Sequence, residues 1–417
     1  MTMARRSLLQ ALGAMIATNG NAMENEDRVG ARLQPWRHGG LDIHHIATGR
    51  GDCSFIIGPD GTGVMIDAGA MYQPGPMNLP QEPNGQRSPG EWIVRYIRRR
   101  LRDTKRSGID TLLVTHLHPD HLGDIAPHLP RASTGGYQLT GVSEIAATIP
   151  IGLILDRGYP DYHWPTDQTA PFARNYIEFI RARLATGGKV ARFQAGRGDQ
   201  ISLANPEAFP KFGIRNLAAN GEVWDGLGDG SRSHLPPIAA LQPDDVPDEN
   251  VLSCAFRLSY GSFRYFAAGD LTSNTFDGAL PWRDVATPAA QVCGPVNVAV
   301  APHHGLFDSS SAGLVRALRA RIWLIDTWHV SHPGMTALER IYSQRLYTGP
   351  RDVLSTGLST ADALVNDRLT RRFASNQGHI VVRVSPDAAR YRVVVTDNRD
   401  EGDRVTKILG PFEIANL

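Results

Sequence analysis

Short apolar runs, most of them ending in a polar or charged residue, recur along the whole chain. They are too short for helices and are bounded by Gly, Pro, Asn or Asp, which is typical of strands joined by turns. A strand is therefore predicted over each of the ranges 41–46, 54–57, 64–66, 109–114, 151–155, 253–258, 263–268, 296–301, 322–326, 379–384 and 391–395.

Helical periodicity occurs between some of these runs. It is clearest at 91–102, where apolar residues recur at helical spacing, and helices are also predicted over 170–185 and 312–320. The arginines of 98–102 are interpreted as a solvated face of the first helix. The alternative, a phosphate-binding patch, is less favoured.

Alternating strands and helices indicate a mixed α and β fold. The predicted division is a leader and linker over 1–36, a large domain over 37–400, and a C-terminal tail over 401–417. Within the domain, about 141–250 is less regular and is interpreted as an elaborated insertion that could shape substrate access.

Composition and charge narrow the class of protein. The chain has 417 residues, 41% hydrophobic and 20% charged, which is ordinary for a globular protein. Its net charge of +1 gives no global reason to expect a nucleic-acid partner, so a polyanion would need a local basic patch. No apolar run of about eighteen residues occurs, and no membrane span is predicted. Cys53, Cys254 and Cys293 are too far apart for a disulfide scaffold or a Cys-x-x-Cys zinc site.

The N-terminus carries a possible export signal. Arg5 and Arg6 precede a modest apolar run to Ala17 and then small residues around Ala22. This pattern resembles a twin-arginine signal and predicts a periplasmic or secreted protein. The alternative is an ordinary N-terminal helix on a cytoplasmic protein.

The segment 116–121 concentrates metal-competent side chains directly after the 109–114 run. His116 and His118 are two residues apart and point the same way from an extended chain, so they can share one ion. Pro119 suits a first helical turn, which would let Asp120 and His121 face a second ion. Imidazole and carboxylate together suit zinc, with manganese or iron as alternatives.

Other predicted strands also end in ligand-type residues. Asp67 follows 64–66, Asp270 follows 263–268, and His303 and His304 follow 296–301. Adjacent residues point apart in an extended chain, so only one of His303 and His304 is expected to bind metal directly. We favour His304, with His303 as a group that supports the site or contacts substrate.

The order His116-Leu117-His118-Pro119-Asp120-His121 resembles the His-x-His-x-Asp-His signature of the metallo-β-lactamase-fold hydrolases. The closest likeness is to the metallo-β-lactamase-like domain of the DNA-uptake competence protein ComEC and its soluble relatives, which include phosphocholine esterases. The motifs that carry it are Gly51-Asp52, Pro59-Asp60-Gly61, Ile66-Asp67-Ala68-Gly69, Gly269-Asp270-Leu271, Pro302-His303-His304-Gly305 and His332-Pro333. The resemblance implies a four-layer αβ/βα sandwich with a two-metal site at one edge of the sheets.

The resemblance also implies roles for these residues. His116 and His118 would hold the first ion, Asp120, His121 and His304 the second, and Asp270 would lie between the ions. Asp67 would support the site, Asp120 could orient the attacking water, and His332 could act as a general acid or simply pack nearby. The third ligand of the first ion stays open, with Asp156, His163 and His234 as candidates.

The predicted function is a metal-dependent hydrolase that uses a two-metal-activated water, on a phosphodiester or related ester. The alternatives are an acyl hydrolase acting on a lactone, thioester or β-lactam, and a metal-binding module without turnover. Metal identity, substrate and oligomeric state stay open, because the fold does not determine the reaction.

Overall fold

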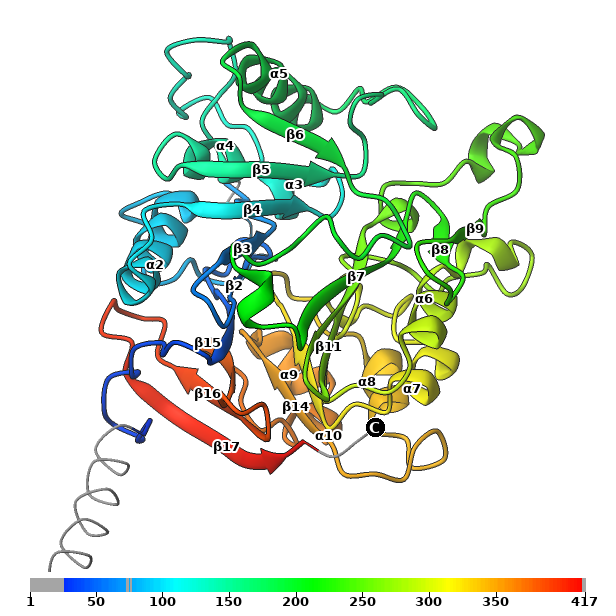
Figure 1. The fold of residues 1–417 in the computed structure, drawn as a ribbon. Helices are drawn as coiled ribbons and strands as arrows, with labels where there is room; N and C mark the ends of the chain where they lie inside the picture. The colour runs from blue at the N-terminus through cyan, green and yellow to red at the C-terminus, as the bar shows by residue number, and fades with distance from the viewer. Residues whose placement is uncertain (1–25, 73–74, 76, 415–417) are drawn as a thin grey trace, which may run out of the picture.

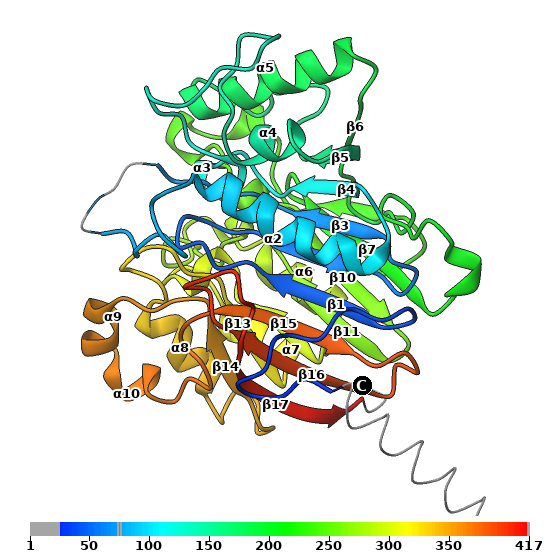
Figure 2. The same cartoon turned by 90° about the vertical axis from the view of Figure 1, so that its left-hand side faces the viewer.

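Two β-sheets packed face to face, with helices on both outer faces, make up the computed structural model (Figures 1 and 2). The structure describes residues 26–72, 75 and 77–414, so most of the predicted leader lies outside the described residues. The predicted α/β sandwich fold is confirmed.

The first sheet has the strand order β17-β16-β15-β1-β2-β3-β4-β5-β6. The strands from β17 to β3 pair antiparallel, whereas β3, β4, β5 and β6 run parallel. Their bounds are β1 (Leu41–His45), β2 (Ser54–Ile57), β3 (Gly63–Ile66), β4 (Ile109–Val114), β5 (Ile151–Asp156), β6 (Lys189–Arg192), β15 (His379–Val384), β16 (Arg390–Thr396) and β17 (Val405–Glu413).

The second sheet has the order β14-β13-β12-β11-β10-β7-β8-β9. Its strands from β11 to β14 run parallel, and the others pair antiparallel. Their bounds are β7 (Phe212–Ala219), β8 (Glu222–Trp224), β9 (Ser231–Ser233), β10 (Ala255–Tyr260), β11 (Phe263–Ala267), β12 (Val298–Val300), β13 (Ile322–Ile325) and β14 (Asp352–Ser355).

The helices cover the outer faces of these sheets. Apolar side chains of α2, α4 and α5 pack on the first sheet, and those of α6, α7 and α8 pack on the second. The bounds are α2 (Pro89–Thr104), α3 (Pro119–Leu122), α4 (Gly141–Ala146), α5 (Pro171–Ala185), α6 (Ala286–Cys293), α7 (Ala312–Leu318), α8 (Met335–Tyr342), α9 (Thr360–Val365) and α10 (Asp367–Thr370).

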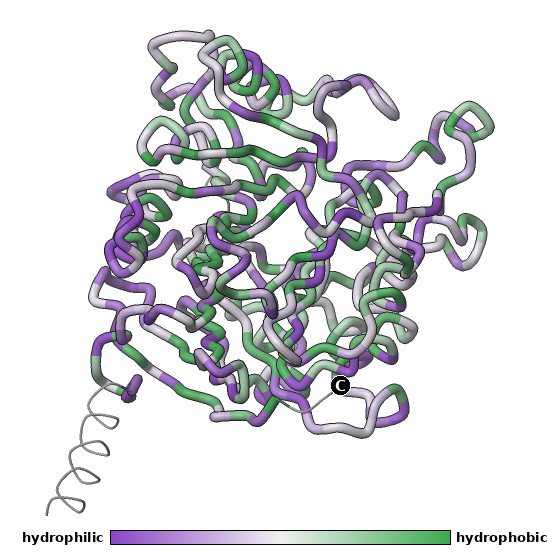
Figure 3. Tube along the Cα trace, in the orientation of Figure 1, coloured by the Kyte–Doolittle hydropathy of each residue, from purple (hydrophilic) through white to green (hydrophobic). Residues whose placement is uncertain are grey.

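The main core lies between the two sheets, where Ile43, Leu113, Phe256, Tyr265 and Val382 belong to one buried cluster. The hydropathy trace in Figure 3 shows the same pattern, with apolar colour concentrated along the strands. Strands buried on both faces read as continuous apolar runs. This is why most strands could be located from the sequence.

The structure departs from the sequence prediction in two segments. The stretch 141–250 contributes β5 and β6 to the first sheet and β7, β8 and β9 to the second, so much of it belongs to the sheets. The C-terminal stretch also holds a strand, β17, which pairs with β16. This strand contains Pro411, and proline is tolerated there because β17 is an edge strand.

The cysteines and helices agree with the remaining expectations. Cys53, Cys254 and Cys293 are free and buried. Among the described residues, no helix is both long and apolar enough to cross a membrane.

Candidate metal centre

The parallel strands bring ligand-type residues to one edge of the molecule. Asp67 follows β3 and His116 follows β4 in the first sheet, while Asp270 follows β11 and His304 follows β12 in the second. Parallel neighbours end at the same edge, and here that edge lies where the two sheets face each other. In Figure 2, α3, which carries Asp120 and His121, lies at this edge.

Two glycines let α3 approach the strand ends closely. A Cβ atom on Gly69 would lie 1.9 Å from the carbonyl oxygen of Asp120, and one on Gly51 would lie 2.4 Å from the same atom. The carbonyl of Asp120 instead accepts a hydrogen bond from the amide of Asp52, at 2.8 Å. The glycines of the motifs Gly51-Asp52 and Asp67-Ala68-Gly69 therefore position the backbone of Asp120.

Asp270 lies at the centre of the ligand-type side chains. Its Oδ2 is 3.7 Å from Nε2 of His116, and its Oδ1 is 3.2 Å from Nε2 of His121. His118 lies next to His116, with its Nδ1 3.0 Å from Nε2 of His116. His116, His118 and Asp270 thus form one group that could hold a metal ion.

A second group shares the carboxylate of Asp270. Nε2 of His304 lies 3.4 Å from Oδ2 of Asp270 and 3.0 Å from Oδ2 of Asp120. Oδ2 of Asp120 is also 3.7 Å from Nε2 of His121. The atoms of Asp120, His121, Asp270 and His304 therefore converge, and all four residues are buried.

The outer nitrogen of each buried histidine is held by another group. Nδ1 of His121 lies 2.8 Å from Oδ2 of Asp67, and Nδ1 of His116 lies 3.1 Å from the Thr115 hydroxyl, which itself donates to Asp67. Nδ1 of His304 lies 3.1 Å from the carbonyl of Asp326. These contacts fix each ring so that Nε2 faces the cluster, as is usual for metal-ligating histidines.

The donor set fits a divalent metal ion. Nε2 of His121 and Oδ1 of Asp270 are buried and face each other without a hydrogen bond. Buried polar atoms are rarely left unpaired, and a cation bound between these two atoms would pair both. Imidazole nitrogens with carboxylate oxygens are ligands that zinc and similar ions accept.

The electrostatics of the cluster point the same way. Burial alone would lower the pKa of His121, but Asp270, Asp120 and Asp67 raise it well above its usual value. Burial would likewise raise the pKa of Asp270, but His121, His304 and His116 hold it well below its usual range. The ionised carboxylates that favour a proton on the His121 ring would favour a divalent cation in its place.

The family comparison agrees with this geometry. Residues 47–132 match the family model of the metallo-beta-lactamase superfamily. That range includes Asp67, His116, His118, Asp120 and His121. The match and the two-sheet fold together support a metal-dependent hydrolase.

Two solved structures resemble this chain at low similarity. A protein assigned as a metal-dependent hydrolase from Parabacteroides distasonis is 14% identical, with 76% of this chain and 94% of that chain covered, at a TM-score of 0.35. Human tRNase Z, short form, is 9% identical, with coverages of 68% and 91% and a TM-score of 0.31. No curated protein matches the sequence. Likenesses at this level leave the reaction of this chain open.

His303 and His304 take different positions. Nδ1 of His303 lies 2.9 Å from Oδ1 of Asp308, and its Nε2 is 3.2 Å from the side-chain amide nitrogen of Asn250. The Nε2 atom is 3.9 Å from Asp270, farther than that of His304. Both ring nitrogens of His303 therefore have partners outside the cluster, whereas Nε2 of His304 faces it.

His332 and Trp328 complete one wall of the site. The ring of His332 stacks on that of His304, with centroids 4.3 Å apart and planes 7° apart. The indole nitrogen of Trp328 donates a hydrogen bond to Oδ2 of Asp120, at 3.0 Å. Trp328 was not predicted from the sequence, because it lies in a loop whose path depends on the tertiary fold.

The three candidates for a third ligand of the first ion lie outside both groups. Asp156 accepts hydrogen bonds from the hydroxyls of Tyr162 and Tyr176. His163 is exposed and pairs with Asp167 at 2.8 Å. His234 is half-buried. Burial lowers the pKa of its ring, and the carboxylate of Asp284 partly offsets this shift. None of them is brought to His116 and His118.

A buried ion pair, Arg157–Glu249, lies beside the His116–His118 loop instead. Arg157 pairs with Glu249, whose Oε2 accepts a hydrogen bond from the amide of Leu117 at 2.9 Å. Gln168 also donates to Glu249, at 2.8 Å. Two nitrogens of Arg157, the amide of Leu117 and the side chain of Gln168 all donate to this carboxylate. It therefore anchors the loop and has little capacity left for an ion.

Asp52 is a site residue whose role was missed from the sequence. Its Oδ1 lies 3.2 Å from Nδ1 of His304, and it groups with His121, Asp270 and His304. Because it meets Nδ1 rather than Nε2, we assign it to orienting the ring. The motif Gly51-Asp52 was the available signal, but nothing in the spacing linked it to a residue some 250 positions later.

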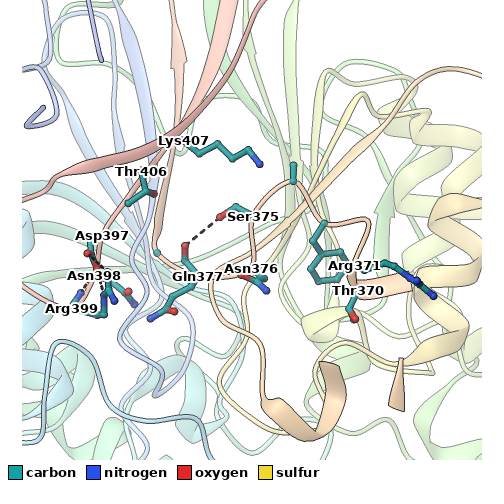
Figure 4. Close-up of a pocket in the computed structure, with 13 residues that line it drawn as sticks. Thr370, Arg371, Ser375, Asn376, Gln377, Asp397, Asn398, Arg399, Thr406 and Lys407 are labelled. Carbon is teal, nitrogen blue, oxygen red and sulfur yellow. Dashed lines mark hydrogen bonds and ion pairs between the residues drawn. The ribbon is translucent and has the colours of Figure 1, made fainter. Parts of the chain in front are cut away.

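A separate polar cavity of about 420 Å³ lies between the 370–378 loop and β17 (Figure 4). Lys407 extends over it, and Asp397, its one lining carboxylate, pairs with Arg399 at 2.6 Å. The histidines and the carboxylate pair that could hold a metal are absent from its lining. Among the described residues, the two groups that could hold a metal ion both lie in the strand-end cluster.

Proposed function

We propose that this protein is a hydrolase that binds two divalent metal ions and cleaves a phosphodiester or related ester. The observation that carries this proposal is the shared position of Asp270, which belongs to both potential metal groups. A carboxylate between two groups of histidines can bridge two ions.

When bound, such a pair of ions supplies a nucleophilic hydroxide at neutral pH and stabilises charge on the substrate oxygens. His116, His118 and Asp270 would hold one ion, and Asp120, His121, His304 and Asp270 the other. Zinc is the first candidate for both, with manganese or iron as alternatives.

The remaining residues position this machinery and move protons. Trp328 and His304 both contact Oδ2 of Asp120, so that carboxylate is held rigidly and can orient a water through its other oxygen. His332 is buried on the ring of His304, where its unpaired Nδ1 could transfer a proton to a leaving group. His303, held between Asp308 and Asn250, would support the site or contact substrate.

A phosphodiester is favoured because a bound pair of ions would stabilise charge on the attacking and the leaving oxygens of an in-line displacement. The acyl reading, with a lactone, thioester or β-lactam substrate, uses the same ligands. A module that binds metal without turnover is the third reading. Export through the leader remains part of the proposal, and a cytoplasmic location is the alternative.

The test combines metal analysis with a substrate panel. Protein loaded with zinc or manganese should contain about two equivalents of metal and cleave bis-p-nitrophenyl phosphate. Asp270→Asn should lower both the metal content and turnover, the latter by more than about a hundredfold. His163→Ala is the matched control, because this exposed histidine should change neither quantity.

Other outcomes separate the readings. Turnover of nitrocefin or a lactone without any phosphodiester cleavage would move the assignment to acyl hydrolysis. Stoichiometric metal without turnover on the whole panel would indicate a binding module. Phosphodiester cleavage that survives Asp270→Asn would rule out the assigned centre.

A further inference from the structure

Large apolar side chains are exposed on segments that contact the loop carrying His332. The described residues include nine large hydrophobic side chains with high exposure, and five of them lie on segments joined to the loop 330–336. These five are Met77, Phe307, Met335, Leu364 and Val365, which are 50% to 81% exposed. We call them the apolar rim.

Hydrogen bonds connect the segment of each member with that loop. The amide of Gly334 donates to the carbonyl of Gly305 at 2.9 Å, and the Thr336 hydroxyl lies 3.3 Å from the carbonyl of Phe307. The segments that carry Phe307 and Met335 therefore run side by side. Phe307 is the third residue after His304, and Met335 the third after His332.

The other members border the same loop. The amide of Val330 donates to the carbonyl of Met77 at 2.8 Å. The Asn366 side chain, which follows Leu364 and Val365, lies 3.4 Å from the carbonyl of Pro333. In Figure 2, α8 and α9 lie on the same side of the molecule as α3. The rim thus surrounds the loop whose His332 stacks on the metal-facing His304.

Exposed apolar residues scattered singly need no explanation, but a group beside a polar centre marks a binding surface. Because the rim is continuous with the loops that carry His304 and His332, its occupant is a molecule that also reaches those residues. A net charge of +1 provides no compensating attraction for a highly charged polymer.

From this juxtaposition we infer that the substrate carries an apolar chain, an acyl or alkyl group that lies on the rim while its ester or phosphodiester enters the metal centre. This inference rests on the proposed function and specifies its substrate class. Each methylene that leaves water favours binding. The enzyme should therefore prefer long-chain substrates over short ones with the same reacting group.

The test compares two monomeric substrates, ethyl p-nitrophenyl phosphate and dodecyl p-nitrophenyl phosphate, below the concentration at which the latter aggregates. For the metal-loaded protein, kcat/KM should be at least about tenfold higher for the dodecyl compound. In Phe307→Ser/Met335→Ser this ratio should fall to near one. The matched control, Val29→Ser/Leu227→Ser, removes two exposed apolar residues outside the rim and should keep the ratio.

A binding measurement separates this inference from the proposed function. Dodecyl phosphate and ethyl phosphate are titrated calorimetrically into the metal-loaded protein, again below aggregation. If neither phosphodiester is cleaved but dodecyl phosphate binds more tightly, and loses this advantage in the rim variant, the proposed function fails and the apolar subsite stands.

Three results would overturn the inference. The first is equal kcat/KM for both chain lengths. The second is a ratio that stays high in the rim variant. The third is a protein that sediments as a dimer, becomes monomeric in the rim variant and shows no chain-length preference, because the rim is then an interface between two copies of the chain.

Discussion

Two buried clusters of carboxylates in this protein are neutralised in different ways. At the metal centre, Asp120 and Asp270 face histidines, and buried atoms of His121 and Asp270 have no hydrogen bond. In the second, which we call the arginine cluster, Asp403 is fully buried between Arg99 and Arg100, at 3.0 and 2.8 Å. One cluster offers ligands that could hold a cation, and the other contains its own cationic partners.

The arginine cluster corrects a sequence interpretation. The arginines of 98–102 were expected on a solvated face of α2, yet Arg100 is buried and Arg99 pairs with both Glu401 and Asp403. Burial alone would raise the pKa of Asp403, but Arg99 and Arg100 hold it below its usual value. These arginines tie α2 to the loop before β17. Arg98 and Arg102, in contrast, are exposed, as the sequence interpretation expected.

Removal of metal is expected to have the largest effect, and only on the first cluster. Dialysis against a chelator should lower turnover by more than about a hundredfold and lower stability by about 3 kcal/mol relative to protein at a metal concentration one hundred times Kd. Activity assays and thermal melts with and without added zinc measure both changes. A melt that does not respond to chelator would contradict a metal held by buried side chains.

Breaking the arginine cluster should have the opposite pattern. Asp403→Ala leaves Arg99 and Arg100 without their buried partner, so we expect a loss of about 3–5 kcal/mol in the free energy of unfolding, with metal stoichiometry unchanged. Urea denaturation and metal analysis test this. The control Asp400→Ala, at an exposed residue three positions earlier, should change stability by less than about 0.5 kcal/mol.

Asp52 sharpens the comparison within the metal centre. Because Oδ1 of Asp52 lies 3.2 Å from Nδ1 of His304 and is not near its Nε2, Asp52→Asn should weaken metal affinity by about 10- to 100-fold without abolishing it. Competition with a metal indicator gives the affinity. A loss as complete as that of Asp270→Asn would instead make Asp52 a direct ligand.

A third carboxylate, Asp362, has neither a metal group nor an arginine beside it among the described residues. We expect its effect on stability to be the smallest. Asp362 has Asn366 as its neutral partner, at 2.5 Å, and burial raises its pKa to about 6. The folded protein therefore favours the protonated form. Its stabilising contribution is fully present below about pH 4, the unfolded pKa, and is lost as pH rises through about 6. The urea midpoint should fall across this window, and Asp362→Asn should reduce that fall; an equal fall in the variant would contradict the assignment.

Much of the fold could be predicted from local patterns. β2 and β4 match their predicted ranges, because short apolar runs between turn residues specify buried strands. β8 (Glu222–Trp224) and β9 (Ser231–Ser233) could not be predicted, because both strands are short and neither forms an apolar run. They are strands only because β7 offers a neighbour to pair with. β17 is longer, but it was also missed, because it is an edge strand that depends on pairing with β16.

The candidate site divides in the same way. Asp67, His116, His118, Asp120, His121, Asp270 and His304 were singled out because each follows an apolar run or belongs to one dense motif. Asp52 and Trp328 carry no such signal, since an aspartate in a turn and a tryptophan in a loop are common. Their roles depend on which atoms of His304 and Asp120 they reach.

The sequence by itself determined which residue types are available for metal chemistry and at which strand ends they lie, because hydrophobic periodicity and dense motifs are local properties. Only the tertiary structure decided which of those residues meet. It brings Asp270 between two histidine groups, turns His304 toward the cluster and His303 toward Asn250, and pairs the arginines of α2 with Asp403. The reason is physical: these relations join segments far apart in the chain, and packing of the two sheets fixes them.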